Sequence, residues 1–177
     1  ELVAADVPPG ETTETVTIES PEMDVHIRDV IEPWMQGLAK MQKAKGIKDQ
    51  KFEASASSNA TTASQAADGK MHTSWVCEAQ DSAAELTLTF PEPVKARRLM
   101  LTQPFQKRED IQRMGLVRKI EVRINGANRP IVIDLHPNPM APTEHAFRKL
   151  QRVSTIAIKV AKRGGKPGLP VGFAEVV

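Results

Sequence analysis

The sequence predicts an all-β protein, an antiparallel β-sandwich, preceded by an N-terminal extension that carries one short helix. From Gln50 onward, runs of five to eight residues rich in β-branched side chains alternate between apolar and polar positions, with turn residues between the runs. The pair Asn125-Gly126, between two such runs, is typical of a hairpin turn. At 177 residues, with 40% apolar and 26% charged residues, the composition is that of an ordinary soluble globular protein.

The extension comprises residues 1–49. Its first 22 residues contain Pro8, Pro9 and Gly10 and are expected to form an extended leader. Apolar residues then recur at spacings of three and four, which predicts an amphipathic helix over about residues 32–45, ended by Gly46. We expect the apolar side of this helix to dock onto its own domain; the alternative is a partner protein.

The β domain comprises residues 50–177. Its expected strands are 86–90, 97–102, 118–124, 131–135, 153–160 and 171–177. Three prolines make residues 136–147 an expected loop, and three glycines do the same for residues 163–170. Loops at the ends of a sandwich usually carry the binding groups.

Charge is distributed unevenly along the chain. Residues 1–36 hold nine acidic residues and one arginine, whereas residues 96–177 hold sixteen lysines and arginines against six acids, a net charge of about +10. Such a surface attracts polyanions, which include nucleic acids, anionic lipids and acidic or sulfated polysaccharides. Aromatic residues make up only 4% of the chain, so the stacking platform of a single-strand nucleic-acid binder is missing and we expect no nucleic-acid partner.

Catalytic patterns are missing as well. The sequence has no G-x-S-x-G, no H-E-x-x-H and no glycine-rich phosphate loop, and its single cysteine, Cys77, excludes a disulfide framework. Glu109 and Asp110 are adjacent, and adjacent carboxylates usually point in different directions, which is unsuitable for glycoside hydrolysis. We therefore expect a binding protein and no enzyme.

The most informative segment is 66–75, which reads AADGKMHTSW. An acid followed by glycine in a tight turn, with a hydroxyl five residues after the acid, can place several oxygens around one hard cation. A run of small residues, 54–58 (ASASS), precedes it. The segments 86–93 (LTLTFPEP) and 172–176 (GFAEV) follow it.

These four segments, in this order, resemble the discoidin or factor V/VIII type C family, which overlaps the family 32 carbohydrate-binding modules of bacterial glycosidases. The resemblance covers about residues 50–177. It implies a β-sandwich jelly roll of the galactose-binding-like type, a binding module without an active site, and a secreted, periplasmic or cell-surface location. Family members bind galactosides, other glycans, phospholipids or proteins through variable loops, so the resemblance leaves the ligand open.

The resemblance also implies a structural calcium ion between the DG loop and the last strand. The matching ligands are the carboxylates of Asp68 and Glu175, the backbone carbonyl of Lys70 and the oxygens of Thr73. Lys70 stands where the family often has Asp or Asn, so its ammonium group is an alternative to the ion. Trp75 is expected in the core beneath this loop.

Loop position and chemistry, without a residue-by-residue family match, suggest where a ligand would bind. A sugar site needs an aromatic ring and polar groups that bridge hydroxyls. The candidates are Phe105, Gln106, Arg108, Arg113, His136, Asn138 and His72. The leading hypothesis is a carbohydrate-binding module that is an accessory domain of a larger glycan-processing protein, with acidic or sulfated glycans favoured by charge. The alternative is a protein-interaction or assembly scaffold with no sugar ligand.

Overall fold

The computed structural model describes residues 32–43, 46–104 and 110–177. The chain divides into two compact units, residues 1–33 and 34–177, and the second unit holds every strand that is described. Helix α2 (Glu32–Lys43) confirms the helix predicted over about residues 32–45. The predicted leader lies outside the described residues.

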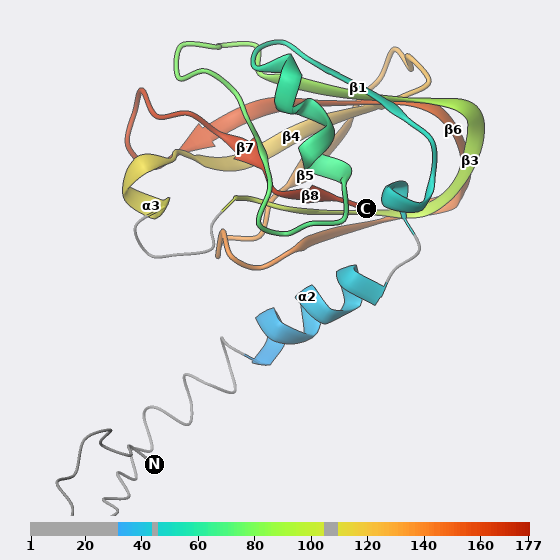
Figure 1. The fold of residues 1–177 in the computed structure, drawn as a ribbon, viewed down its shortest axis with the longest axis horizontal. Coiled ribbons are helices and arrows are strands. Elements are labelled where there is room, and N and C mark those ends of the chain that lie inside the picture. Colours follow the sequence, from blue (N-terminus) through green and yellow to red (C-terminus); the bar gives the residue numbers. More distant parts are fainter. Residues whose placement is uncertain (1–31, 44–45, 105–109) are drawn as a thin grey trace, which may run out of the picture. The chain divides into compact units, whose positions relative to one another are not determined.

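The described strands pair antiparallel, which confirms the predicted all-β class. Strands β3 and β6 are long, and Figure 1 shows two layers that are joined where these two strands curl over together. The larger sheet has the order β1-β3-β6-β4-β5 with β8 added to β3, and β2 pairs separately with β7. The strands are β1 (Glu53–Ala56), β2 (Trp75–Val76), β3 (Glu85–Thr102), β4 (Leu116–Ile124), β5 (Ile131–Asp134), β6 (Thr143–Gly164), β7 (Gly172–Phe173) and β8 (Glu175–Val176).

Short helices fill the connections. The 3₁₀ helix η2 (Ile47–Asp49) precedes β1, and the longer η3 (Ala60–Ala67) leads into the DG loop. Helix α3 (Asp110–Arg113) precedes β4. The three alanines Ala63, Ala66 and Ala67 are buried, because small side chains allow η3 to lie close against the sandwich.

Strands β3 and β6 lose their register twice along their shared ladder. At the first irregularity, residues 90–93 of β3 lie between the pairs Thr89↔Thr155 and Val94↔Val153. At the second, residues 147–150 of β6 lie opposite Arg97. Extra residues in one strand of a pair bend it and increase its twist, so these two bulges mark where the sheet turns from one layer into the other.

Asn125 stabilises the first bulge from the neighbouring hairpin. Its φ is 52°, in the left-handed region that the predicted Asn-Gly turn requires. Its side-chain Oδ1 accepts hydrogen bonds from the backbone N–H groups of Ser154 and Thr155, at 2.7 and 3.1 Å. Its Nδ2 donates to the carbonyl oxygen of Arg152 at 2.7 Å. The asparagine therefore satisfies backbone groups of β6 at the interruption in the β3 ladder.

Several expected boundaries are wrong. The predicted strands 86–90 and 97–102 are halves of the single strand β3, because its prolines lie at a bulge, where no ladder donor is needed. The predicted loops 136–147 and 163–170 are shorter, since β6 runs from Thr143 to Gly164. The predicted strand 171–177 is interrupted between β7 and β8.

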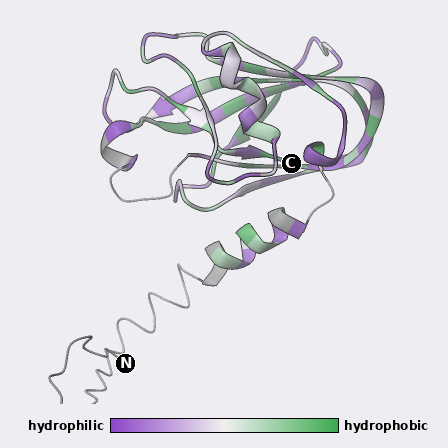
Figure 2. Cartoon of the chain, in the orientation of Figure 1, coloured by the Kyte–Doolittle hydropathy of each residue, from purple (hydrophilic) through white to green (hydrophobic). Residues whose placement is uncertain are grey.

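The core lies between the layers and follows the period of two expected of strands. Leu86, Leu88 and Phe90 of β3 are buried, whereas Thr89 is exposed. Figure 2 shows this alternation of hydrophobic and hydrophilic residues along the strands. Ile120, Val122, Ile158 and Val171 complete the centre of the same cluster.

The structure confirms that Trp75 lies in the core. Its side chain is fully buried and stacks on Phe173, with the ring centroids 6.0 Å apart. Its indole N–H donates to the carbonyl oxygen of Ser58 at 2.9 Å.

The hydroxyls of Ser57 and Ser58 donate to Asp81 at 2.5 and 2.6 Å. Burial alone would raise the pKa of Asp81, but these hydrogen bonds hold it below its ordinary value.

Helix α2 contacts the sandwich through its C-terminal half. Met41 is 1% exposed, and the ammonium group of Lys40 lies 2.5 Å from a carboxylate oxygen of Glu144 on β6. The Lys40 hydrogen bond is the main cause of the lowered pKa of Glu144, and the charge of Arg98 on β3 adds to it. The C-terminal half of the helix thus docks onto its own unit, whereas Met35 near its start is 59% exposed.

Gly172 offers a test of how tightly β7 packs on β2. A Cβ atom at this position would collide with the backbone of Trp75 and Val76. We expect Gly172→Ala to lower the free energy of unfolding by about 2–3 kcal/mol, measured by urea denaturation. The control is Gly126→Ala, which meets open space and carries only the strain of a positive φ, about 1 kcal/mol. Equal losses in the two variants would contradict this account.

Candidate functional site

The DG loop, residues 68–73, brings several oxygens to one point. Gly69 has a φ of +79°, which lets the chain reverse directly after Asp68. The carboxylate of Asp68 accepts a hydrogen bond from the backbone N–H of Lys70 at 2.8 Å. The Thr73 hydroxyl lies 2.9 and 3.0 Å from the two Asp68 carboxylate oxygens and 2.8 Å from the Lys70 carbonyl oxygen.

This arrangement has more acceptors than protons. A threonine hydroxyl carries a single proton, so Thr73 can donate to only one of the three oxygens that surround it at any moment. The other two oxygens then face a lone pair of the Thr73 hydroxyl oxygen. A hard cation among these oxygens would remove that repulsion, and carboxylate, carbonyl and hydroxyl oxygens are the ligands that calcium takes in proteins.

Glu175 on β8 faces the same loop. It is 2% exposed, and its carboxylate oxygens accept the Gly69 N–H at 3.1 and 3.3 Å. Burial, and then the negative charge of Asp68, raise the pKa of Glu175 to about 7, against the lowering effects of the Gly69 hydrogen bond and the charge of Lys48. The structure therefore places Asp68 and Glu175, distant in sequence, in one electrostatically strained pair.

The residues present fit a calcium site in part. Asp68, Glu175, the Lys70 carbonyl and Thr73 supply hard oxygens, although the described part of the chain has no group of three or more His, Cys, Asp and Glu that could hold a metal. Thr102, the partner of Glu175 in the β3–β8 ladder, has a buried hydroxyl with no hydrogen-bond partner among the described residues. An additional ligand could satisfy this buried hydroxyl, which belongs to the residue opposite Glu175.

A lysine other than the expected one acts on this site. Lys70 has an exposed side chain, and the cationic group that lowers the pKa of Glu175 is Lys48 of η2. A Cβ added at Gly69 would meet the Lys48 methylenes, so the lysine chain passes over the loop where glycine leaves room. Sequence reasoning missed Lys48 and Thr102 because neither lies in the DG segment, and only the fold brings them to it.

The predicted ligand-binding residues are distributed over several loops. Phe105, Gln106 and Arg108 lie outside the described residues. Arg113 is exposed at the end of α3, and His72 is exposed within the DG loop. His136 is exposed, and its Nδ1 accepts the backbone N–H of Asn138 at 3.1 Å.

Strand pairing places part of this set at one end of the sandwich. Because β4 and β5 are antiparallel, helix α3 before β4 and the loop after β5 leave from the same end. The Arg118 guanidinium donates to the carbonyl oxygen of Pro137 at 3.0 Å and so ties this loop to the start of β4. Arg113, His136 and Asn138 therefore share an end of the sandwich, and their role in binding stays a prediction.

Comparison with solved structures identifies the fold. A family 32 carbohydrate-binding module of the Clostridium perfringens protein NanJ, solved with galactose, matches 73% of this chain and 93% of its own, with 20% identity and a TM-score of 0.60. A family 32 module of a family 31 glycoside hydrolase from the same organism covers 74% and 91%, with 15% identity and a TM-score of 0.59. An F5/8 type C domain from Bacteroides fragilis covers 71% and 88%, with 19% identity and a TM-score of 0.51.

By sequence, no family model and no curated protein matches the chain. The structural likeness confirms the predicted galactose-binding-like β-sandwich and the resemblance to discoidin and family 32 modules at the level of the fold.

Calcium should stabilise the protein if the DG loop and Glu175 hold the ion. At about 100 times its Kd, calcium would raise the free energy of unfolding by about 2.7 kcal/mol relative to chelator, measured by thermal denaturation. Glu175→Gln should remove this increment. Asp81→Asn, a carboxylate variant with no part in the DG loop, should keep it, and Lys48→Met should bind calcium more tightly because a competing positive charge is gone. No response to calcium in either the unmodified protein or Lys48→Met would refute the site.

Proposed function

From the fold of family 32 carbohydrate-binding modules and F5/8 type C domains, we propose that this protein is a non-catalytic carbohydrate-binding module. The observation that supports it most directly is the match over 73% of the chain to a module solved with galactose. Another neighbour was solved with GalNAc-β-1,3-galactose. One neighbour comes from a family 31 glycoside hydrolase and another from a chitosanase/glucanase, which supports an accessory role beside a glycan-processing enzyme.

The proposed loop site lies at the end of the sandwich that carries α3 and residues 136–142. Arg113 and His136 are exposed there, and Asn138 follows in the same loop. A guanidinium and an imidazole can each hydrogen-bond adjacent sugar hydroxyls, and loops anchored on a rigid sandwich can vary in sequence without loss of the fold. His72 would join the site through the DG loop, with calcium as a structural clip.

The preferred glycan in this proposal is acidic or sulfated. The net charge of about +10 over residues 96–177 favours such polymers over neutral ones, and it raises the rate at which they are captured. A secreted, periplasmic or cell-surface location follows from the kind of polymer bound. No helix in the described part of the chain has the length and apolar character to cross a membrane.

A second candidate function is a protein-interaction or assembly scaffold. The observation in its favour is the position of the aromatic rings. Trp75, Phe90 and Phe173 are buried, and Phe52 and Phe147 are partly buried, so no Trp or Phe ring whose burial is described is fully exposed for stacking on a sugar. In this alternative the β-sandwich has no sugar ligand.

A glycan array with neutral galactosides and with sulfated and uronic polysaccharides distinguishes the two candidates. We expect selective binding that persists at raised salt, and a loss of about tenfold in affinity for the selected glycan in Arg113→Ala or His136→Ala. Lys166→Ala, an exposed cation in another loop, is the control and should bind as the unmodified protein does. No binding to any glycan on the array, or binding that depends on charge alone and disappears at raised salt, would favour the protein-interaction scaffold.

A further inference from the structure

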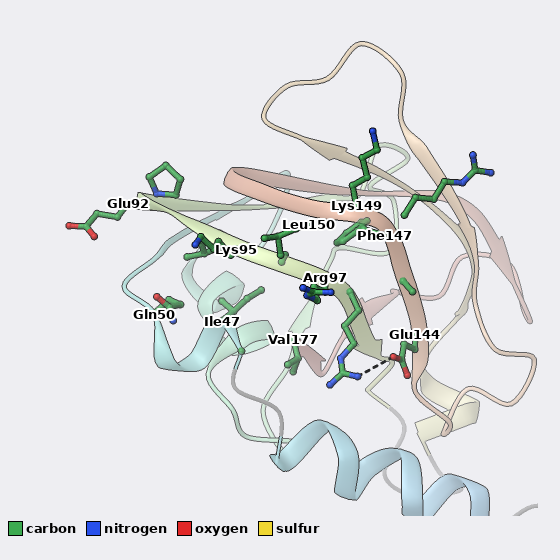
Figure 3. Close-up of a pocket in the computed structure, with 17 residues that line it drawn as sticks. Ile47, Gln50, Glu92, Lys95, Arg97, Glu144, Phe147, Lys149, Leu150 and Val177 are labelled. Atoms are coloured by element: carbon green, nitrogen blue, oxygen red, sulfur yellow. Dashed lines mark hydrogen bonds and ion pairs between the residues drawn. The ribbon is translucent and has the colours of Figure 1, made fainter.

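A groove of about 1210 Å³ lies along β3 and β6. It is lined by β3 residues 92–98, by β6 residues 144–150 except His145, by Gly46, Ile47 and Gln50 around η2, and by Val177. Figure 3 shows Lys95 and Arg97 of β3 on either side of the η2 residue Ile47 and the β6 residue Leu150. Its volume exceeds what one monosaccharide would fill, so it suits an extended chain.

The lining is strongly basic. Two acidic residues oppose the basic ones, and one of them, Glu144, is already paired with Lys40 at 2.5 Å and with Arg98 at 3.4 Å. Four exposed cations of the lining make no ion pair with any described residue. They are Lys95, Arg97, Arg148 and Lys149.

The second bulge of the β3–β6 ladder creates this concentration of charge. Residues 147–150 lie opposite Arg97, where a regular ladder would place a single residue. The extra residues bring Arg148 and Lys149 to the same stretch of sheet as Lys95 and Arg97. Bulges commonly re-aim side chains at functional sites, and here the bulge adds two unpaired cations, Arg148 and Lys149, to the border of the groove.

The groove also has an apolar component. Leu150 is 48% exposed, and Ile47, Ala96, Ala146 and Val177 lie beside the charged residues. A pyranose ring presents C–H groups on its faces and polar groups at its edge, so apolar residues flanked by cations can contact both parts of an acidic sugar.

We propose that this groove is a second glycan-binding surface, which takes an extended anionic polysaccharide through its carboxylate or sulfate groups. The inference rests on the proposed carbohydrate-binding function and adds to it a second site, to which the charged groups of the glycan bind. Arginine is suited to this ligand because its planar guanidinium binds a carboxylate or sulfate through two hydrogen bonds.

Other polyanions fit the groove less well. Single-stranded nucleic acids require exposed aromatic rings for base stacking, and the ring in the lining, Phe147, is partly buried and packs against the core. An acidic protein partner would need a desolvated anchor pocket, whereas this groove is open and bordered by exposed charges.

The test measures affinity by titration calorimetry for four probes: a galacturonic acid hexasaccharide, a heparin-derived sulfated hexasaccharide, a neutral galactan hexasaccharide and hexathymidylate. The groove variant is Lys95→Gln/Arg97→Gln. Its matched control, Arg129→Gln/Lys162→Gln, removes the same charge from exposed positions outside the groove. The loop variant is Arg113→Ala/His136→Ala. Unchanged thermal denaturation would show that each variant is folded.

We expect the groove variant to bind at least one anionic hexasaccharide about tenfold more weakly, with less than about a twofold loss in the control. Binding of the neutral hexasaccharide should be unchanged. Equal losses in the groove variant and the control, or a loss confined to the loop variant, would overturn the inference, as would equally tight binding of hexathymidylate. If only the neutral hexasaccharide binds, the inference about the groove is overturned but the proposed function is not. If no glycan binds, the proposed function is overturned as well.

Discussion

The burial of Trp75 holds the domain together. Its ring stacks on Phe173 of β7, and its N–H satisfies the carbonyl oxygen of Ser58. Three segments, 54–58, 66–75 and the distant 172–176, therefore meet around one side chain. Aromatic pairs contribute about 0.5–1.5 kcal/mol beyond their buried area, and the indole hydrogen bond fixes the orientation of the ring. Gly172 permits this approach, because any side chain there would enter the backbone of β2.

The same closure creates the oxygen-rich site. Once β7 is fixed beside β2, the following strand β8 pairs with the end of β3 and brings Glu175 to the N–H of Gly69. A buried carboxylate near Asp68 is unfavourable by itself, as its raised pKa shows. The packing of an aromatic ring thus forces two acids together, and a cation would relieve the resulting repulsion.

Much of the fold could be predicted because it is encoded locally. The alternation of apolar and polar residues predicted β4 and β5, and the Asn125-Gly126 pair predicted the hairpin between them. The DG segment predicted the loop that holds the candidate oxygens. The bulges could not be predicted, since a proline inside β3 looks like the end of a strand until its partner is known. For the same reason the groove was missed. Arg97, Arg148 and Lys149 contributed to the charge count of residues 96–177, but only strand pairing places residues 147–150 opposite Arg97.

The bulge at residues 147–150 lets the surface of the sheet change without a change in the core. On either side of it, pairs such as Ala96↔Gln151 and Arg98↔Ala146 fix the ladder independently. A residue inserted or deleted between these two pairs would change the width and charge of the groove. It would not move buried side chains of the flanking strands to the solvent face, whereas a one-residue slip in a regular strand would. This stretch of the sheet is therefore free to diverge in length as a loop does, and the protein can acquire a different specificity on a strand while its interior stays the same.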